Sequence, residues 1–411
     1  MTRALMAAAL AAVIGASAWA GPIRAGVAKR TITPSEPGQF LAGYSPNRPA
    51  ETVHDDLWVR ALALSDGETT LVLAVCDLLG FMYPDALEMR QSVQGVPKEN
   101  VILACTHVHS APDCIGLWGP NPTKTGVDPK YLAFVKQRVG ECLNEAVAAM
   151  QPARIGFAIT HAPERTAHNT NVASVIDPAI DLLVVDDAEG KRLATLVNWA
   201  CHPEVLSTPS KAVTSDLCHY LREEVEGRVG GMAMHFNGAL GGMVTPMDES
   251  ETFAEAERIG RAVGAAAADA TRDMKMTDQT VLRVASKTFD VPIKNPLFQL
   301  AFGLDVIARP SASTDRVTTE VEAFCIGPAQ FATCPGEALP TVGFAAKGMM
   351  TGRPTFFIGL AQDELGYIMP PEYCDLKLYE YERSMSIGPD IAPAVLGALA
   401  ELLPEVSPPG A

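Results

Sequence analysis

The stretch Val101-Ile-Leu-Ala-Cys-Thr-His107-Val-His109-Ser-Ala-Pro112 is an apolar run that ends in two histidines. Its first five residues predict a buried β-strand. Side chains two residues apart leave a strand on the same face, so we expect both imidazoles to point into one place. A neutral imidazole is the commonest protein ligand for zinc, and a catalytic zinc needs three protein ligands and an open position. The remaining ligands must come from other parts of the chain.

Apolar runs of similar length recur along the 411 residues and alternate with helical patterns. This alternation predicts an α/β fold in which helices cover the faces of the sheets. Two runs separated by Gly327-Pro328 read as a hairpin, so we expect mixed, partly antiparallel sheets in a single domain. The expected strands are Thr70–Cys76, Val101–Cys105, Arg154–Ile159, Asp181–Val185, Ala194–Cys201, Met232–Phe236, Thr280–Ser286, Val321–Ile326, Gln330–Cys334 and Pro354–Leu360, and the expected helices are Pro129–Met150, Leu217–Glu226, Thr252–Met274, Ala338–Met350 and Ile391–Leu403.

The composition is typical of a folded protein, with 48% hydrophobic and 19% charged residues. A net charge of −16 without any basic cluster argues against a nucleic-acid partner. Arg3, the apolar stretch Leu5–Ala16 and small residues before Gly21 predict a secretory signal peptide, the alternative being an N-terminal anchor. No later segment is long and apolar enough to span a membrane. The expected division is a signal peptide at residues 1–20, a folded domain at residues 21–403 and a flexible tail at residues 404–411, in a protein that is periplasmic or secreted.

The nine cysteines are an odd and scattered set without any C-x-x-C pair. Most of them lie in apolar runs, so we expect free, buried thiols. An oxidising compartment leaves one or two disulfides open as an alternative.

Five short stretches hold the polar residues best suited to chemistry, and each ends a predicted strand or begins a helix. Such positions hold a side chain firmly while it faces a cleft. Taken singly these signals are weak, because a strand-end histidine is more often a hydrogen-bonded structural residue, and Glu337 also suits the start of a helix. The stretches are Thr106–His109, Asn198–Glu204, His235–Pro246, Thr333–Glu337 and Asp363–Pro370, with Tyr381–Ser384 just beyond.

Two known classes of metal enzyme with an H-x-H pair do not match. The metallo-β-lactamase pattern continues with an Asp-His pair, whereas Ser110-Ala-Pro-Asp113 follows here. An amidohydrolase barrel would place the pair early in a regular eightfold β/α rhythm, whereas this rhythm is irregular and two strand-like runs precede the pair.

In this order, the stretches together resemble the catalytic domain of the neutral (non-lysosomal) ceramidases. The resemblance begins at Ala25–Pro34, passes through Gly43-Tyr44, Arg60–Ala63 and Asp77, and reaches Tyr381, so that it covers nearly the whole folded domain. It implies a zinc ion and the fold of that domain. The zinc ligands that it implies are His107, His202, Glu337 and Tyr367.

The resemblance also implies roles for residues around the metal. His109 and Tyr381 are expected to donate hydrogen bonds to the developing oxyanion while water activated by zinc attacks the acyl carbonyl. Thr245 stands where the family has a serine, and we expect its hydroxyl to hold the reacting group together with the amides of the glycine turn. The substrate-binding residues are expected to be Asn171, Asn237 and Gly242.

Two features of the family are missing. Its Asn-Arg pair, which helps to hold substrate, is replaced by Ala167–Asn171. No residues remain for its immunoglobulin-like C-terminal domain. The zinc chemistry is thus expected to be kept while the parts that recognise ceramide differ.

These observations predict an exported zinc-dependent hydrolase that cleaves an N-acyl amide bond in a small-molecule or lipid substrate. A second hypothesis is a metal-dependent hydrolase or lytic enzyme of the same fold that acts on another N-acyl amine, an ester or a sugar-derived substrate. A third is an exported binding protein with a vestigial metal site. Metal analysis separates the first two from the third.

Overall fold

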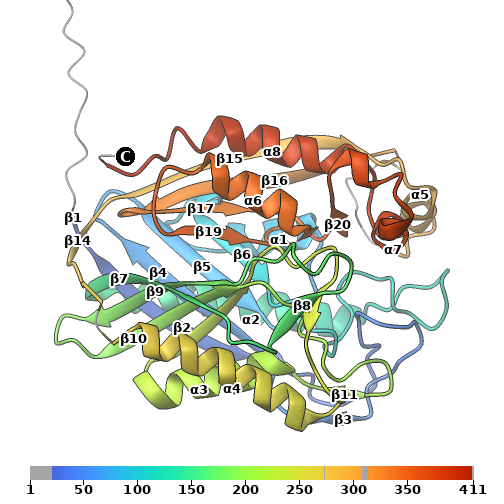
Figure 1. Ribbon diagram of the computed structural model, residues 1–411, viewed down its shortest axis with the longest axis horizontal. Coiled ribbons are helices and arrows are strands. Elements are labelled where there is room, and N and C mark those ends of the chain that lie inside the picture. Colours follow the sequence, from blue (N-terminus) through green and yellow to red (C-terminus); the bar gives the residue numbers. More distant parts are fainter. Residues whose placement is uncertain (1–20, 273, 308, 310–312, 314, 410–411) are drawn as a thin grey trace, which may run out of the picture.

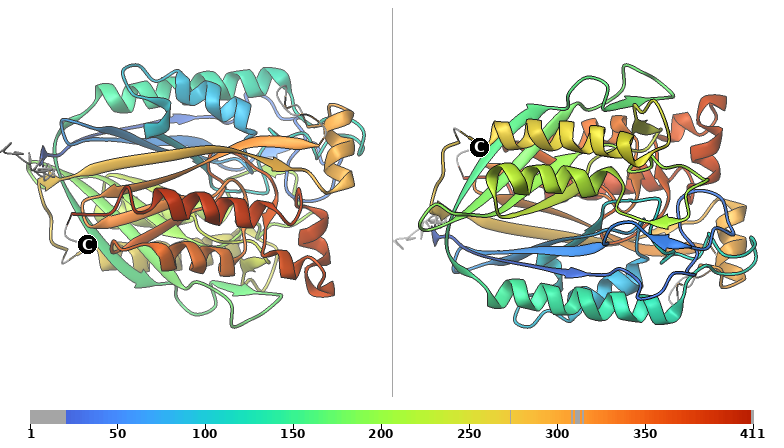
Figure 2. Two further views of the ribbon diagram at one scale, coloured as in Figure 1. Left: turned by 90° about the horizontal axis from the view of Figure 1, so that it is seen from above. Right: turned by 90° about the horizontal axis from the view of Figure 1, so that it is seen from below.

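The structure is a computed structural model that describes residues 21–272, 274–307, 309, 313 and 315–409. The expected signal peptide therefore lies outside the described residues. Two stacked β-sheets with helices on both outer faces form the described part of the chain (Figures 1 and 2). Each helix among the described residues is too short or too polar to cross a membrane.

The larger sheet has eight strands, and the smaller sheet has four. Both are mixed, because parallel pairs (β5 with β6, β10 with β12, β17 with β19) occur among antiparallel ones. This confirms the predicted mixed α/β fold. The larger sheet runs in the order β12 (Met232–Asn237), β10 (Arg192–Trp199), β9 (Ala179–Asp187), β7 (Gln151–His161), β2 (Arg24–Thr31), β4 (Trp58–Ser65), β5 (Thr70–Cys76) and β6 (Val101–Cys105), and the smaller sheet in the order β15 (Leu282–Pro292), β16 (Arg316–Ile326), β17 (Ala329–Thr333) and β19 (Thr355–Ile358).

Helices cover the outer face of each sheet. Four of them pack on the larger sheet, and α6 and α8 lie on the smaller one (Figure 1). The predicted helices are all present, whereas α1, α5 and α7 were not expected. The helices are α1 (Tyr83–Gln91), α2 (Pro129–Ala148), α3 (Leu217–Val229) and α4 (Phe253–Ala270) on the larger sheet, and α5 (Pro296–Gly303), α6 (Pro340–Met349), α7 (Glu380–Ser384) and α8 (Ile391–Leu402) in the C-terminal part.

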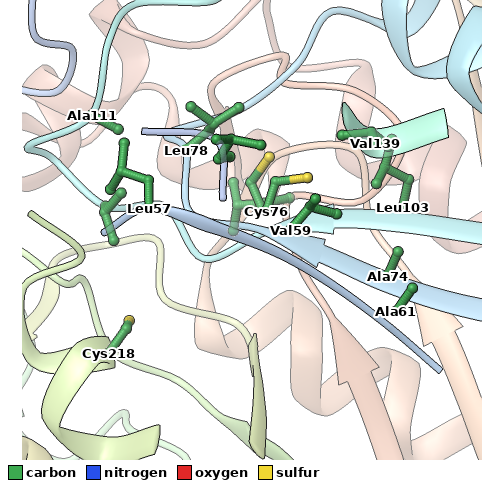
Figure 3. Close-up of a cluster of buried hydrophobic side chains, with 14 of the residues drawn as sticks. Leu57, Val59, Ala61, Ala74, Cys76, Leu78, Leu103, Ala111, Val139 and Cys218 are labelled. Carbon is green, nitrogen blue, oxygen red and sulfur yellow. The ribbon is translucent and has the colours of Figure 1, made fainter. Parts of the chain in front are cut away.

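The side chains of each strand alternate between two buried layers. In β4, Val59 and Ala61 face the helices of the larger sheet, while Leu62 and Leu64 lie in the apolar layer between the two sheets. Figure 3 shows part of the first layer, where Val59 lies beside Cys76. Because both faces of the sheet are covered, its strands read as continuous apolar runs instead of alternating ones.

Strand β4 was missed in the sequence because Arg60 interrupts its apolar run. Arg60 is only 5% exposed, and its guanidinium pairs with Glu226 on α3 and donates to the Ala233 carbonyl. Strand β2, which carries Lys29 and Arg30, was missed as well. Charged residues within a strand, whether buried with a partner as Arg60 is or exposed as Lys29 is, thus hide the strand from a reading based on hydrophobicity alone.

Residues 404–409 lie in the tail that we expected to be flexible, and two of them contact the rest of the fold. Val406 is 1% exposed, and the Ser407 carbonyl accepts a hydrogen bond from Arg283 on β15. The predicted hairpin is confirmed, since β16 and β17 pair antiparallel across Gly327, which has a φ of 56°. Four short pairs of strands complete the fold: β1 (Gly21–Pro22) with β14 (Gln279–Thr280), β3 (Thr52–Val53) with β11 (Ala212–Val213), β8 (Ala167–Asn169) with β13 (Val244–Pro246), and β18 (Glu337–Ala338) with β20 (Tyr367–Ile368).

Candidate metal centre

Segments that follow the carboxyl ends of strands from both sheets meet at one place. His107 follows β6, His202 follows β10, and Glu337 follows β17. Although β6 and β12 are opposite edges of the larger sheet, Asn237 at the end of β12 joins them. Its amide Nδ2 donates to the Thr106 carbonyl at 2.8 Å and to the Cys201 carbonyl at 3.0 Å. The twist of an eight-stranded sheet thus brings its two edges together at the site.

The two histidines nearest the predicted metal have fixed tautomers. His107 Nδ1 lies 2.9 Å from the Leu79 carbonyl, and His202 Nδ1 lies 2.8 Å from the Val244 carbonyl. A carbonyl oxygen only accepts, so each Nδ1 carries a proton, and in the neutral ring Nε2 has the lone pair. This is the arrangement that metal-binding histidines adopt, with the second nitrogen donating to a backbone or carboxylate oxygen.

Glu337 lies between these two lone pairs. Its Oε2 is 3.0 Å from His202 Nε2 and 3.4 Å from His107 Nε2. Burial alone would raise the pKa of Glu337, yet the two histidines hold this pKa well below its usual range. Burial alone would likewise lower the pKa of His202, yet Glu204 and Glu337 raise it to about 9. Three acceptors that face one another need a shared cation, either a proton or a metal ion.

The spacing of these atoms fits zinc. Donors about 2.0–2.1 Å from a tetrahedral ion lie about 3.3 Å from one another, close to the two separations at Glu337. His107, His109 and His202 also form a group whose nitrogens lie within 4.8 Å of one another, the one group of potential metal ligands found in the described part of the chain. The shorter contacts favour Glu337 over His109 as the third ligand. Nitrogen and carboxylate donors together suit zinc.

Tyr367, the fourth expected ligand, is placed by the short parallel pair β18 and β20. Tyr367 on β20 is the direct register partner of Glu337 on β18. The phenol is 4% exposed, and its hydroxyl donates to Met243 Sδ at 3.3 Å. Burial, followed by the Glu337 carboxylate, raises the pKa of Tyr367 well above its usual value. The phenol is therefore neutral unless a cation lies beside it.

His109 lies next to these ligands but has different partners. The rings of His107 and His109 are 4.9 Å apart. They converge as expected, although for another reason: the strand ends at Cys105, and His107 has a left-handed φ of 67°. The His109 ring also lies on Gly43, where a Cβ atom would come within 2.4 Å of His109 Cγ. A glycine is therefore required at position 43.

A carboxylate for which we expected no role, that of Glu204, lies beside His109. Glu204 Oε2 lies 3.3 Å from His109 Nδ1, and its Oε1 accepts a hydrogen bond of 2.6 Å from the Thr245 hydroxyl. Thr245 thus contacts Glu204, a partner that we did not expect. The only sequence signal for Glu204 was its place two residues after His202, which does not predict this contact.

The three expected substrate-binding residues are engaged elsewhere. Asn171 donates to the buried Glu382 carboxylate at 2.5 Å. The amide of Asn237 is fully occupied, because its Oδ1 also accepts from the Cys201 amide at 3.0 Å. Gly242 packs on Leu339, whose Cγ would lie 2.9 Å from an added Cβ. In the structure all three residues contact neighbouring protein segments, and their binding of substrate stays a prediction.

A small cavity of ≈ 40 Å³ opens beside His107, His109 and Glu337. Tyr381 lies at its edge with 55% of its surface exposed, and its ring meets that of Tyr367 edge-on at 5.9 Å. Glu364 lines the cavity as well and was not expected; burial and then Glu337 raise its pKa well above the usual range. The other lining residues are Gly43, Leu79, Ile115, Leu117, Trp118, Phe298, Gly366, Tyr367 and Met385.

Solved structures with a similar architecture are known. A crystal structure of neutral ceramidase from Pseudomonas aeruginosa superposes with a TM-score of 0.78 and 19% sequence identity, over 94% of this chain and 75% of that one. The chain has the neutral ceramidase fold. A second structure, described as a ceramidase complexed with C2, gives a TM-score of 0.77 and 18% identity over 95% of this chain and 76% of that one. No protein-family model matches the chain, and no curated protein matches it. The expected resemblance to the neutral ceramidases is therefore confirmed for the fold.

Proposed function

We propose that this protein is a zinc-dependent hydrolase that cleaves the amide bond of an N-acyl amine. One observation carries the proposal: Nε2 of His107 and Nε2 of His202 both face Glu337 Oε2, while both Nδ1 atoms are bound to backbone carbonyls. The metal would be held by His107, His202 and Glu337, with Tyr367 as the fourth ligand. The neutral ceramidase fold supports an amide substrate.

In the proposed reaction, water adds to the acyl carbon, the C–N bond breaks, and the products are a carboxylic acid and an amine that takes up a proton. Zinc, when bound, lowers the pKa of water to about 7 and polarises a carbonyl. The Tyr381 phenol donates a hydrogen bond to the oxygen on which negative charge develops. His109 supplies the second polar contact to the reacting atoms. Ile115, Leu117 and Phe298 receive the apolar acyl group.

A second substrate class remains a candidate because of the size of the cavity. At ≈ 40 Å³ it is far below the roughly 300–1,000 Å³ of pockets that enclose drug-sized ligands. A smaller N-acyl amine, an ester or a sugar-derived substrate would fit it better than a ceramide with two long chains. The catalytic groups are the same in either case.

Metal analysis and a substrate panel test this proposal. We expect one zinc per chain after gentle purification, and hydrolysis that is lost with a chelator and restored by zinc. The panel should contain ceramides and simple N-acyl amines with acyl chains from two to sixteen carbons, together with matched esters. Protein that binds no zinc, or that hydrolyses none of these compounds when zinc is bound, would contradict the proposal.

We further propose that the protein is exported and cleaved before Gly21. The support is the sequence pattern of Arg3, the apolar stretch Leu5–Ala16 and the small residues Ala18 and Ala20. Expression of the full chain in a bacterial host, followed by N-terminal sequencing of the periplasmic and secreted fractions, tests this. A chain found only in the cytoplasm with Met1 intact would contradict export.

A further inference from the structure

His109 is held by contacts on several sides. Its amide donates to the Pro203 carbonyl at 3.3 Å, and its carbonyl accepts from Arg48. Tyr44 meets the His109 ring edge-on at 5.0 Å and donates its hydroxyl proton to the Glu204 carbonyl at 2.7 Å. His109 is 7% exposed, and the Glu204 carboxylate lies 3.3 Å from its Nδ1 without forming a hydrogen bond to it.

Glu204 is itself fixed in place. Its side chain is 13% exposed, and Oε1 is bound by the Thr245 hydroxyl at 2.6 Å. Thr245 lies on β13, which pairs with β8. It therefore comes from a different segment of the chain than His109 and Glu204. A carboxylate only accepts hydrogen bonds, so Thr245 must donate, and Oε2 is left to face the histidine.

A carboxylate beside one nitrogen of a neutral imidazole favours the tautomer with the proton on that nitrogen. The opposite tautomer would place the Nδ1 lone pair against the negative charge of Oε2. Neither ring nitrogen of His109 makes a hydrogen bond among the described residues, so it is the charge of Glu204 at 3.3 Å that distinguishes Nδ1 from Nε2, and Nε2 then carries a free lone pair.

We propose that Glu204, held by Thr245, is the positioning residue that keeps the proton of His109 on Nδ1 and presents Nε2 as a hydrogen-bond acceptor to the reacting atoms. This assigns His109 to receive the proton of the attacking water, which reverses the donor role expected from the sequence. It also gives Thr245 a role that requires no contact with substrate. The kinetic consequences rest on the proposed function, whereas the tautomer does not.

The test uses two matched variants at Thr245 and one at Glu204. Thr245→Val removes the hydroxyl at nearly constant shape, and Thr245→Ser keeps a hydroxyl. Glu204→Met keeps the length of the side chain and removes both acceptor oxygens. In protein labelled with ¹⁵N at histidine, with the His109 signals assigned by their loss in His109→Gln, we expect a proton on Nδ1 in the wild type and in Thr245→Ser. In Thr245→Val and Glu204→Met we expect a mixture of the two tautomers.

Kinetics on the best substrate of the panel provides the second measurement. We expect kcat to fall about 10-fold in Thr245→Val and Glu204→Met, with KM and bound zinc little changed, and to recover in Thr245→Ser. The double variant should be no slower than Glu204→Met alone, because both changes break one chain of contacts.

Two results would overturn the inference. An unchanged His109 tautomer in both Thr245→Val and Glu204→Met would show that Glu204 does not set it. If Thr245→Val lowered kcat as much in the Glu204→Met background as it does in the wild type, Thr245 would act on the substrate directly. If the zinc-loaded wild type hydrolyses nothing, the proposed function fails while the NMR measurement still decides the tautomer. If Glu204→Met fails to fold, Thr245→Val and Thr245→Ser decide it alone.

Discussion

At the scale of single residues, the site depends on which nitrogen of each histidine carries a proton. Backbone carbonyls hold that proton on Nδ1 in His107 and His202 by hydrogen bonds, whereas at His109 the Glu204 carboxylate lies 3.3 Å from Nδ1 without a hydrogen bond. The three rings lie within 5.6 Å of one another, yet only His107 and His202 face the Glu337 carboxylate. Neighbouring imidazoles can therefore have separate tasks.

A pair of alanine variants tests this division of tasks. His107→Ala removes a ligand, so zinc affinity should fall by more than the roughly 10–100-fold that is usual for an outer partner of a metal site. His109→Ala should keep its zinc and lose about 10²-fold in kcat. Bound zinc is measured by elemental analysis after dialysis, and turnover on the same samples. Loss of zinc in His109→Ala would instead make His109 a ligand.

His235 on β12 makes the stability of the fold sensitive to acid. Burial, and to a lesser degree the charge of Arg222, lowers the pKa of His235 to about 3. Between about pH 3 and 6.5 the unfolded chain binds a proton that the folded chain does not. The folded state is therefore not penalised at His235 above pH 6.5, and the unfolding free energy decreases as the pH falls from 6.5 toward 3.

Replacing His235 with phenylalanine should remove this slope. Between pH 6.5 and pH 3, the unfolding free energy of His235→Phe should decrease less than that of the wild type. The difference between the two decreases should be up to about 5 kcal/mol. Urea unfolding curves at several pH values measure the difference, and the curves at pH 8 report the effect of packing alone. Parallel pH profiles for the two proteins would disprove the assignment.

At the scale of elements, the site is a junction of strand ends that one asparagine helps to hold. Asn237 binds the backbone of Thr106 and Cys201, the residues directly before His107 and His202. It therefore fixes the two ligand-bearing segments relative to each other. Asn198 on β10 is a suitable comparison, because it is also buried and donates to two backbone carbonyls, those of Phe236 and Phe357, both at 3.0 Å.

Alanine at these two positions should separate stability from metal binding. Each variant leaves buried backbone groups without partners, so each should lose about 2–4 kcal/mol of unfolding free energy. Only Asn237→Ala should also weaken zinc binding, by about 10-fold or more, because it frees both ligand segments. Chemical unfolding and zinc titration measure the two effects. Equal zinc affinity in both variants would contradict the junction role.

The sequence predicted individual elements better than their assembly. The bounds of β5 and β6 match the apolar runs, since a strand covered on both faces has a simple local signal. The meeting of β6 with β12 had no local signal, because it depends on the pairing order of eight strands. The proposed metal ligands His107 and Glu337 were found through a family pattern, whereas no pattern pointed to the contact between Glu204 and Thr245.

At the scale of the whole molecule, four layers put the cysteines out of reach of solvent. All nine are free, and eight of them are buried; Cys374 alone is partly exposed. The buried thiols include Cys76 and Cys105, whose pKa burial raises well above the usual value. A thiol that is neither ionised nor accessible does not react, which reconciles the eight buried free cysteines with a proposed oxidising compartment.

Thiol titration tests this explanation. The folded protein should react at Cys374 alone, and slowly, because burial raises the pKa of that thiol too. Nine thiols should react after denaturation. The same counts are expected from protein recovered from the periplasm of the expression host, since packing and not the redox potential of the compartment keeps the thiols free. Fewer than nine thiols in denatured periplasmic protein, with nine in cytoplasmic protein, would mean that disulfides form during export and that burial does not protect the chain before it folds.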